Sequence, residues 1–206
     1  MQRCVIVGGA DIQNYDFLRS VLSPTDFFIF CDSGLKHLSA LGAQPHLIVG
    51  DFDSHENPSL PVETIVLPRE KDDTDTFFAV KEALRRGFEE FLLLGVIGGR
   101  LDHSLGNLSI LLYLQALGKH GRILDDHSEM EIVGSRPITI SDRFPYFSLL
   151  NISGIARGIT VTDAKYPLEN GEITAQYAFG VSNEVLPGRT VTVSVAEGNL
   201  LLIKVR

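Results

Sequence analysis

Short apolar runs alternate with helix-like patterns through the first 126 positions of the chain. Between the runs typical of buried strands, apolar residues return every three or four positions. This alternation predicts an α/β domain in which a mostly parallel sheet is flanked by helices, a Rossmann-like arrangement. The strands are expected at 4–9, 26–32, 46–53, 63–68, 90–98 and 121–126.

Helices are expected in the segments between these strands. They fall at 15–22, around 35–41, at 76–86 and from about 104 to 117. Gly42, Gly87 and Gly118 stand where the last three helices should stop, and Asp73 or Thr74 stands where the helix at 76–86 should begin. These end signals support the strand–helix alternation.

Beyond about residue 126 the pattern changes to strands alone. Runs rich in β-branched residues follow one another, and helical spacing is absent. They predict a second domain, an all-β sandwich at 127–206. The turn signal Glu197-Gly198-Asn199 lies between the last two runs, which are therefore expected to form an antiparallel hairpin.

Composition and charge narrow the possible functions. The 206 residues are 44% hydrophobic, enough for a real core. The net charge of -8 argues against binding to nucleic acid or to an anionic membrane, because both require basic residues. No apolar segment approaches the roughly 20 residues of a membrane span, and no signal peptide is apparent, so a cytoplasmic protein is expected. Cys4 and Cys31 lie in apolar runs and are expected to be buried free thiols.

Acidic side chains gather directly after several predicted strands. Asp51 and Asp53 belong to one extended segment, where alternate side chains share a face, so both carboxylates can point at one spot. Hard oxygen ligands of this kind suit Mg²⁺, which usually arrives with substrate phosphates. The other acids near strand ends are Asp32, Asp72, Asp73, Asp75 and Asp102. Because ligands of open α/β sheets bind at the carboxyl ends of the strands, one shared site is expected.

Helix capping is the competing interpretation of an aspartate that follows a strand. It accounts for Asp73 or Thr74, but not for the segment GDFDS, which no helix pattern follows, nor for Arg100 and Asp102 behind a glycine pair. The chain has no GxxxxGK[ST] loop, no GxSxG elbow and no Cys/His cluster. A Walker-type loop is thereby excluded, and acyl transfer and zinc chemistry are disfavoured. Phosphoryl transfer is the class that remains.

Several motifs together resemble the thiamine pyrophosphokinase family. They are CDSG (31–34), PHLIVGDFDS (45–54), KDDTD (71–75), GVIGGRLDH (95–103) and GVSNE (180–184), in the family's order. The resemblance implies an enzyme that transfers pyrophosphate from ATP to the hydroxyl of thiamine, giving thiamine diphosphate and AMP. It also implies Mg²⁺ and a homodimer with sites shared between subunits. The domain at 1–126 would bind ATP and Mg²⁺ and carry catalysis, and the domain at 127–206 would bind thiamine and dimerise.

The resemblance also implies roles for single residues of the first domain. Asp51, Asp53 and Asp75 would bind the metal, and Asp75 or Asp102 would be the catalytic carboxylate. The residues near the nucleotide would be Asp32, Ser33, Gly34, Lys71, Thr74, Arg100 and His103. Many members have glycine where this chain has Ser33.

In the second domain, Ser182 and Asn183 match the element that the family uses near thiamine. The chain has no Trp, so the aromatic residue that would face the pyrimidine ring is open, with Tyr177 and Phe179 as candidates. Two alternatives also stay open. One is a metal-dependent phosphohydrolase that uses the same carboxylates, and the other is a non-catalytic sensor that binds a nucleotide or thiamine.

Overall fold

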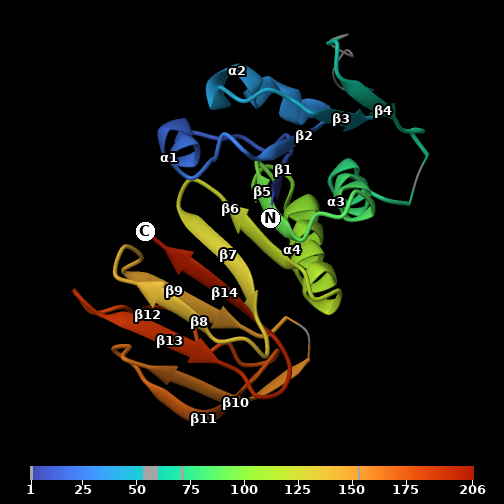
Figure 1. Ribbon diagram of the computed structural model, residues 1–206. Helices are drawn as coiled ribbons and strands as arrows, with labels where there is room; N and C mark the ends of the chain where they lie inside the picture. Colours follow the sequence, from blue (N-terminus) through green and yellow to red (C-terminus); the bar gives the residue numbers. More distant parts are fainter. Residues whose placement is uncertain (1, 53–59, 71, 153) are drawn as a thin grey trace. The chain divides into compact units, whose positions relative to one another are not determined.

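The computed structural model describes residues 2–52, 60–70, 72–152 and 154–206. The residue contacts divide the chain into two compact units, 1–126 and 127–206. Within the described ranges, the first unit combines helices with strands, and the second consists of strands and their connections (Figure 1). No helix in these ranges is long and apolar enough to cross a membrane.

A parallel sheet forms the centre of the first unit (Figure 1). Its strands are β1 (Arg3–Val7), β2 (Phe27–Cys31), β3 (Leu47–Gly50), β4 (Glu63–Val66), β5 (Glu90–Leu94) and β6 (His120–Leu124). They lie in the order β6-β5-β1-β2-β3-β4, and every pairing among them is parallel. The prediction of an α/β unit with a parallel sheet is therefore confirmed.

Side chains on both faces of the central strands are buried, which explains their continuous apolar runs. Val7, Phe30 and Leu94 belong to one cluster that packs against α1 and α2. Cys4 and Cys31 are buried and free, as expected, and burial raises the pKa of both thiols. The two cysteines therefore serve as apolar side chains of the core.

Helices connect the strands of this sheet. They are α1 (Tyr15–Ser20), the 3-10 helix η1 (Asp32–His37), α2 (Leu38–Leu41), α3 (Asp75–Arg85) and α4 (Leu101–Ala116). The Thr74 hydroxyl accepts a hydrogen bond from the Phe77 amide at 3.2 Å, so Thr74, and not Asp73, is the N-cap of α3. Gly42 ends α2 in the left-handed conformation, as expected.

Helix α4 begins earlier than the sequence predicts. The expected start was near Ser104, but the helix starts at Leu101, with Arg100 at the N-cap position. The Ser104 hydroxyl donates to the Arg100 carbonyl at 3.0 Å and accepts from the Gly98 amide at 3.0 Å. These two bonds close an additional first turn. Asp102 therefore lies on a helix and not in the preceding loop.

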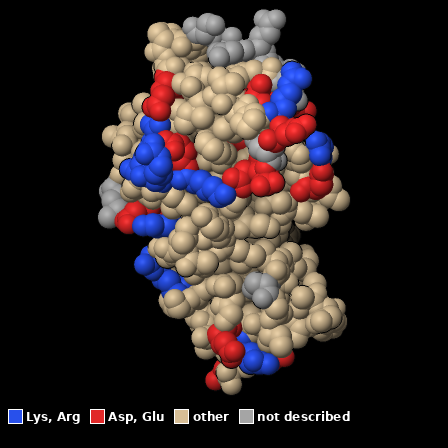
Figure 2. Space-filling model, turned by 90° about the vertical axis from the view of Figure 1, so that its right-hand side faces the viewer, with Lys and Arg blue, Asp and Glu red and all other residues tan. Residues whose placement is uncertain are grey.

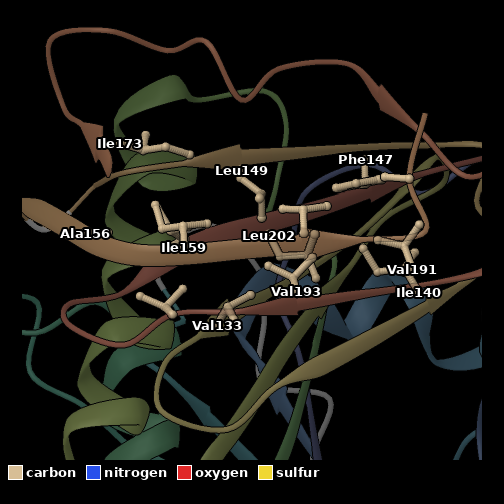
Figure 3. Close-up of a cluster of buried hydrophobic side chains, with 14 of the residues drawn as sticks. Val133, Ile140, Phe147, Leu149, Ala156, Ile159, Ile173, Val191, Val193 and Leu202 are labelled. Atoms are coloured by element: carbon tan, nitrogen blue, oxygen red, sulfur yellow. The ribbon is translucent and has the colours of Figure 1, made fainter. Parts of the chain in front are cut away.

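The second unit consists of two antiparallel layers. One contains β7 (Ser128–Val133), β9 (Tyr146–Leu150), β12 (Asn183–Glu184) and β14 (Leu200–Val205), and the other contains β8 (Ile138–Ser141), β10 (Ile155–Thr162), β11 (Leu168–Thr174) and β13 (Thr190–Ser194). Figure 3 shows that Val133, Phe147 and Leu202 from the first layer share a core with Ile159 and Val193 from the second. The predicted all-β domain is confirmed.

The predicted hairpin between the last two strands is wrong. Strand β13 pairs with β8 and β10, whereas β14 pairs with β7 and β9. A turn is present at Gly198, with φ 86°, but it carries the chain from one layer to the other. Val191 and Val193 of β13 and Leu200 and Leu202 of β14 all belong to the shared core. Placing the two strands in opposite layers lets both apolar faces point into that core.

A buried ion cluster joins β7 to β14. The ammonium group of Lys204 is hydrogen-bonded to Glu129 and, at 2.6 Å, to Glu131. The three side chains are only 6–7% exposed. Because two carboxylates and one ammonium group are removed from water here, each depends on its partners for compensation.

We predict that Lys204→Met lowers the free energy of unfolding by about 3–5 kcal/mol, because two buried carboxylates lose the ammonium group that both contact. Lys165→Met is a matched control, since Lys165 pairs with Glu184 at 2.6 Å on the surface. Removing an exposed pair costs about 0–1 kcal/mol. Urea unfolding measures both variants, and equally small losses would contradict a stabilising role for the buried cluster.

Candidate active site

The carboxyl ends of the parallel strands meet at a cavity of about 740 Å³. The chain continues from β1 toward β2 on one side and from β5 toward β6 on the other, so its direction reverses between β1 and β5. Ligands of open α/β sheets bind at such a point. Residues from the loops after β1, β2, β3 and β5 and from the segment before α3 line the cavity.

Three carboxylates converge in this cavity. Asp32 follows β2, Asp51 follows β3, and Asp75 is the first residue of α3. One carboxylate oxygen from each lies within 4.8 Å of the others. Carboxylates this close repel one another unless a cation lies among them. Three hard oxygen donors at this spacing fit Mg²⁺.

The backbone at Asp32 and Gly50 makes this convergence possible. Asp32 has φ 35°, a conformation that few residues other than glycine adopt, and its side chain is buried. A Cβ atom on Gly50 would lie 3.0 Å from the Cβ atom of Asp32. The absence of a side chain at Gly50 therefore lets the end of β3 approach β2 closely. This approach brings Asp51, the next residue along the chain, beside Asp32.

The cavity brings together most of the residues predicted for this site. Those that line it are Asp32, Ser33, Asp51, Thr74, Asp75, Arg100 and His103. Asp53 and Lys71 lie outside the described residues. Gly34 and Asp102 are not among the lining residues, although both are neighbours in sequence of residues that are. A Cβ atom on Gly34 would lie 2.2 Å from the Val7 carbonyl oxygen, so this glycine permits close packing of the loops after β1 and β2.

Asp102 holds Arg100 through two hydrogen bonds. The Arg100 Nε atom lies 3.2 Å and one terminal nitrogen 2.6 Å from the two carboxylate oxygens. Both side chains are largely exposed. The guanidinium group of Arg100 lowers the pKa of Asp102 to about 2. Asp102 is therefore a stable carboxylate that orients an arginine at the cavity.

Glycines form the wall of the cavity between β1 and β2. Gly8 and Gly9 follow β1 and both line the cavity. A Cβ atom on Gly9 would lie 1.8 Å from the Ser33 hydroxyl oxygen. The serine that this chain has in the CDSG motif thus occupies the space directly beside Gly9, so any side chain at position 9 would displace it.

Several residues of this cavity were not predicted from the sequence. Arg69 contributes a cation from the segment before α3, and Asn107 lies on the buried face of α4. The Asn107 side chain donates to the Val96 carbonyl at 2.7 Å and so ties α4 to the loop after β5. The position of Arg69 two residues before Lys71 was the available signal. Asn107 gave none, because a polar residue on a helix is usually exposed.

Acidic and basic side chains are interspersed on the face of the molecule in Figure 2. Around α3, Arg86, which follows the helix, pairs with Glu82, and Lys81 pairs with Asp73, which precedes it.

The second unit contains a smaller pocket, of about 200 Å³. Ser182 and Asn183 line it, as do Tyr166 and Phe179. The Asn183 side chain accepts from the Tyr166 amide at 3.1 Å and donates to the Tyr166 carbonyl at 2.7 Å. It also accepts from the Glu184 amide at 2.8 Å. Asn183 therefore fixes the backbone that presents Tyr166.

Of the two aromatic candidates from the sequence, Phe179 lines this pocket. Tyr177 is not among the lining residues, but its ring centroid lies 5.7 Å from that of Phe179. Tyr166 was not a candidate. The pairing of Lys165 with Glu184, in which the Lys165 amide donates to the Glu184 carbonyl at 3.0 Å, brings Tyr166 beside Asn183.

The fold and the site define a class of protein. It has a cluster of carboxylates suited to a metal ion at the edge of a parallel sheet, and it has a separate antiparallel β unit. Residues 18–121 match the family described as "Thiamin pyrophosphokinase, catalytic domain", and residues 137–200 match "Thiamin pyrophosphokinase, vitamin B1 binding domain". The chain is 32% identical over 212 residues to the thiamine pyrophosphokinase of Bacillus subtilis, with 99% of both chains covered. The chain belongs to the thiamin pyrophosphokinase family, a family of enzymes.

Comparison with solved structures indicates the same family. The crystal structure of thiamine pyrophosphokinase from Bacillus subtilis superimposes with a TM-score of 0.86 at 27% identity and covers 99% of each chain. That of thiamin pyrophosphokinase from Geobacillus thermodenitrificans superimposes with a TM-score of 0.84 at 28% identity, covering 100% of this chain and 98% of the other. The similarity therefore extends over both units.

We predict that Asp102 titrates near pH 2 and that Arg100→Gln raises its pKa toward the ordinary aspartate range, while the backbone hydrogen bond from His103 still lowers it. Because the folded-state pKa is lowered, the stabilisation from this pair is present above the ordinary pKa and is lost as the pH falls through about 2. Carboxyl ¹³C shifts followed by NMR measure the titration. Lys36→Gln removes a cation that pairs with Asp11 and should leave Asp102 unchanged. An ordinary Asp102 titration in the unmodified protein would contradict the pairing.

Proposed function

We propose that this enzyme transfers pyrophosphate from ATP to the hydroxyl of thiamine, giving thiamine diphosphate and AMP. The observation that carries the proposal is the convergence of Asp32, Asp51 and Asp75 at the carboxyl edge of the parallel sheet. Such an acidic site accepts a triphosphate when cations bridge the two sets of negative charge. The membership of both units in the family supports thiamine as the acceptor.

We infer that Asp32, Asp51 and Asp75 hold Mg²⁺, together with Asp53, the predicted ligand outside the described residues. When bound, Mg²⁺ neutralises phosphate charge. The family resemblance implied a place near the nucleotide for Asp32, whereas its position in the carboxylate cluster supports a metal role.

The remaining polar residues of the cavity would bind and orient the nucleotide phosphates. Arg100 and Arg69 supply positive charge, and Ser33, Thr74 and His103 supply polar groups. Lys71 is also proposed to bind phosphate, and Gly34 to keep the loops after β1 and β2 in close contact.

For the base, the surroundings favour Asp75 over Asp102. A carboxylate with a pKa of about 2 is a weak base, and Asp102 does not line the cavity. We propose that Asp75 lies closest to the reacting hydroxyl and that Asp102 acts by orienting Arg100.

Thiamine would bind at the pocket of the second unit. Thiamine is a cation, and the faces of aromatic rings attract cations. Tyr166 and Phe179 supply aromatic rings to this pocket, which Ser182 also lines, and the Lys165 ammonium group already lies over the Tyr166 ring, 5.4 Å from its centroid. Asn183 would act indirectly, since its amide already bonds to the backbone of Tyr166 and Glu184.

We further propose a cytoplasmic homodimer in which one subunit's Rossmann-like unit and its partner's β unit share each site. Mixing Asp51→Asn protein with Tyr166→Ala protein should then restore part of the lost activity, because one kind of mixed site carries neither change. Failure of rescue after subunit exchange has been verified would argue for sites within one subunit. A monomeric protein in sedimentation equilibrium would also contradict the dimer.

A direct prediction concerns the products of the reaction. With ATP, Mg²⁺ and thiamine, the protein should release AMP in a one-to-one ratio with thiamine diphosphate, because a pyrophosphate group is transferred. Chromatography of the nucleotides measures this ratio, and omission of thiamine is the control. Release of ADP would indicate ordinary kinase chemistry. Phosphate release without thiamine would indicate a phosphohydrolase, and binding without turnover would indicate a sensor.

Another prediction concerns the metal requirement. Asp51→Asn should raise the Mg²⁺ concentration for half-maximal activity by at least about 10-fold, because it removes one negative ligand from the cluster. Asp73→Asn is the matched control: Asp73 pairs with Lys81 at 2.7 Å and does not line the cavity. An unchanged magnesium requirement in Asp51→Asn would remove Asp51 from the proposed ligand set.

A further inference from the structure

The loop after β1, residues 8–11, forms one wall of the cavity and is attached to neighbouring elements on two sides. Toward β5, the Gly8 amide donates to the Leu94 carbonyl and the Ala10 amide to the Gly95 carbonyl, each at 2.8 Å. Toward η1, the Lys36 ammonium group lies 2.7 Å from the Asp11 carboxylate. The position of this wall therefore depends on both neighbours.

His37 makes the second contact from η1 and is almost completely buried. Its Nε2 atom lies 2.9 Å from the Ala10 carbonyl oxygen, and its Nδ1 atom lies 2.8 Å from the Tyr15 hydroxyl. A carbonyl oxygen can only accept, so Nε2 carries the hydrogen. In the neutral ring Nδ1 then accepts from the Tyr15 hydroxyl. The two contacts thus select one tautomer and fix the orientation of the ring.

The surroundings keep this ring neutral. The pKa of His37 is lowered, first by burial and further by the nearby Lys36, while the bond to Ala10 and the charge of Asp11 act in the opposite direction. A neutral imidazole with Nε2–H is therefore the form that holds the Ala10 carbonyl.

Helix η1 links His37 to the carboxylate cluster. It begins at Asp32, whose carboxylate lies in the cluster, and ends at His37, which bonds to the loop after β1. A short helix thus connects two walls of the same cavity. Any displacement of the loop changes its distance from the carboxylates.

We propose that His37 is a positioning residue that sets the spacing between residues 8–11 and the carboxylate cluster for a metal-bound triphosphate. It does so through the Ala10 carbonyl and does not itself contact substrate. This inference rests on the proposed function, because it takes Mg·ATP as the ligand of the cavity. Loss of a residue that orients the groups around a metal site typically costs roughly 10- to 100-fold in metal affinity or activity.

The test compares variants that keep or lose the Nε2–H donor. His37→Leu removes both hydrogen bonds, whereas His37→Gln keeps an N–H group that can reach the Ala10 carbonyl. His46→Leu is the control. His46 directly precedes the first residue of β3, and its Nδ1 atom accepts a hydrogen bond from the Phe28 amide at 3.0 Å. Calorimetry with Mg·ATP in the absence of thiamine gives Kd without turnover, and thermal unfolding reports stability.

His37→Leu should raise Kd for Mg·ATP roughly 10- to 100-fold, and His37→Gln should recover most of this loss. His46→Leu should lower the melting temperature without changing Kd. Native-like Mg·ATP affinity in folded His37→Leu would overturn the proposal, as would equal loss in His37→Gln and His37→Leu. In ¹⁵N NMR spectra at pH 7, His37 should show the hydrogen on Nε2, and a hydrogen on Nδ1 instead would also contradict the account.

These outcomes are separate from those of the reaction assay. Protein that binds Mg·ATP but forms no AMP would refute the proposed function and leave the His37 inference intact. Protein that fails to bind Mg·ATP at all would overturn both.

Discussion

Mutual repulsion among Asp32, Asp51 and Asp75 is the constraint on which the first unit depends. A parallel sheet delivers successive strand ends to one edge, and here the ends of β2 and β3, together with the start of α3, place carboxylate oxygens within 4.8 Å of one another. Such an arrangement opposes folding unless a cation compensates it. The backbone accommodates it locally through the positive φ of Asp32 and the missing side chain of Gly50.

The parts of the cavity around the carboxylates are held by bonds that do not involve them. Asp102 orients Arg100, Asn107 ties α4 to the loop after β5, and His37 ties the loop after β1 to η1. Preformed walls of this kind reduce the reorganisation that substrate binding would require. The same division of labour recurs in the second unit, where Asn183 holds the backbone of Tyr166.

Local patterns were sufficient to predict the order of the strands in the first unit, the change to strands alone near residue 126 and the acidic edge, because burial on both faces and loop chemistry leave direct traces in sequence. Strands β3 and β5 nevertheless end earlier than predicted, at Gly50 and Leu94. Contacts between distant segments left no such trace. The approach of Asp32 to Asp51 depends on Gly50, and Tyr166 reaches Asn183 through pairing of two segments far apart in the chain. The hairpin prediction failed because the turn at Gly198 does not specify which layer the next strand joins.

Anomalous diffraction from crystals grown with Mn²⁺ and a nonhydrolysable ATP analogue tests the central claim most directly, since Mn²⁺ uses the same oxygen ligands as Mg²⁺. The account predicts an anomalous peak in contact with carboxylate oxygens of Asp32, Asp51 and Asp75, beside the phosphates of the analogue. A peak elsewhere, or phosphates bound with no metal at these three carboxylates, would contradict it.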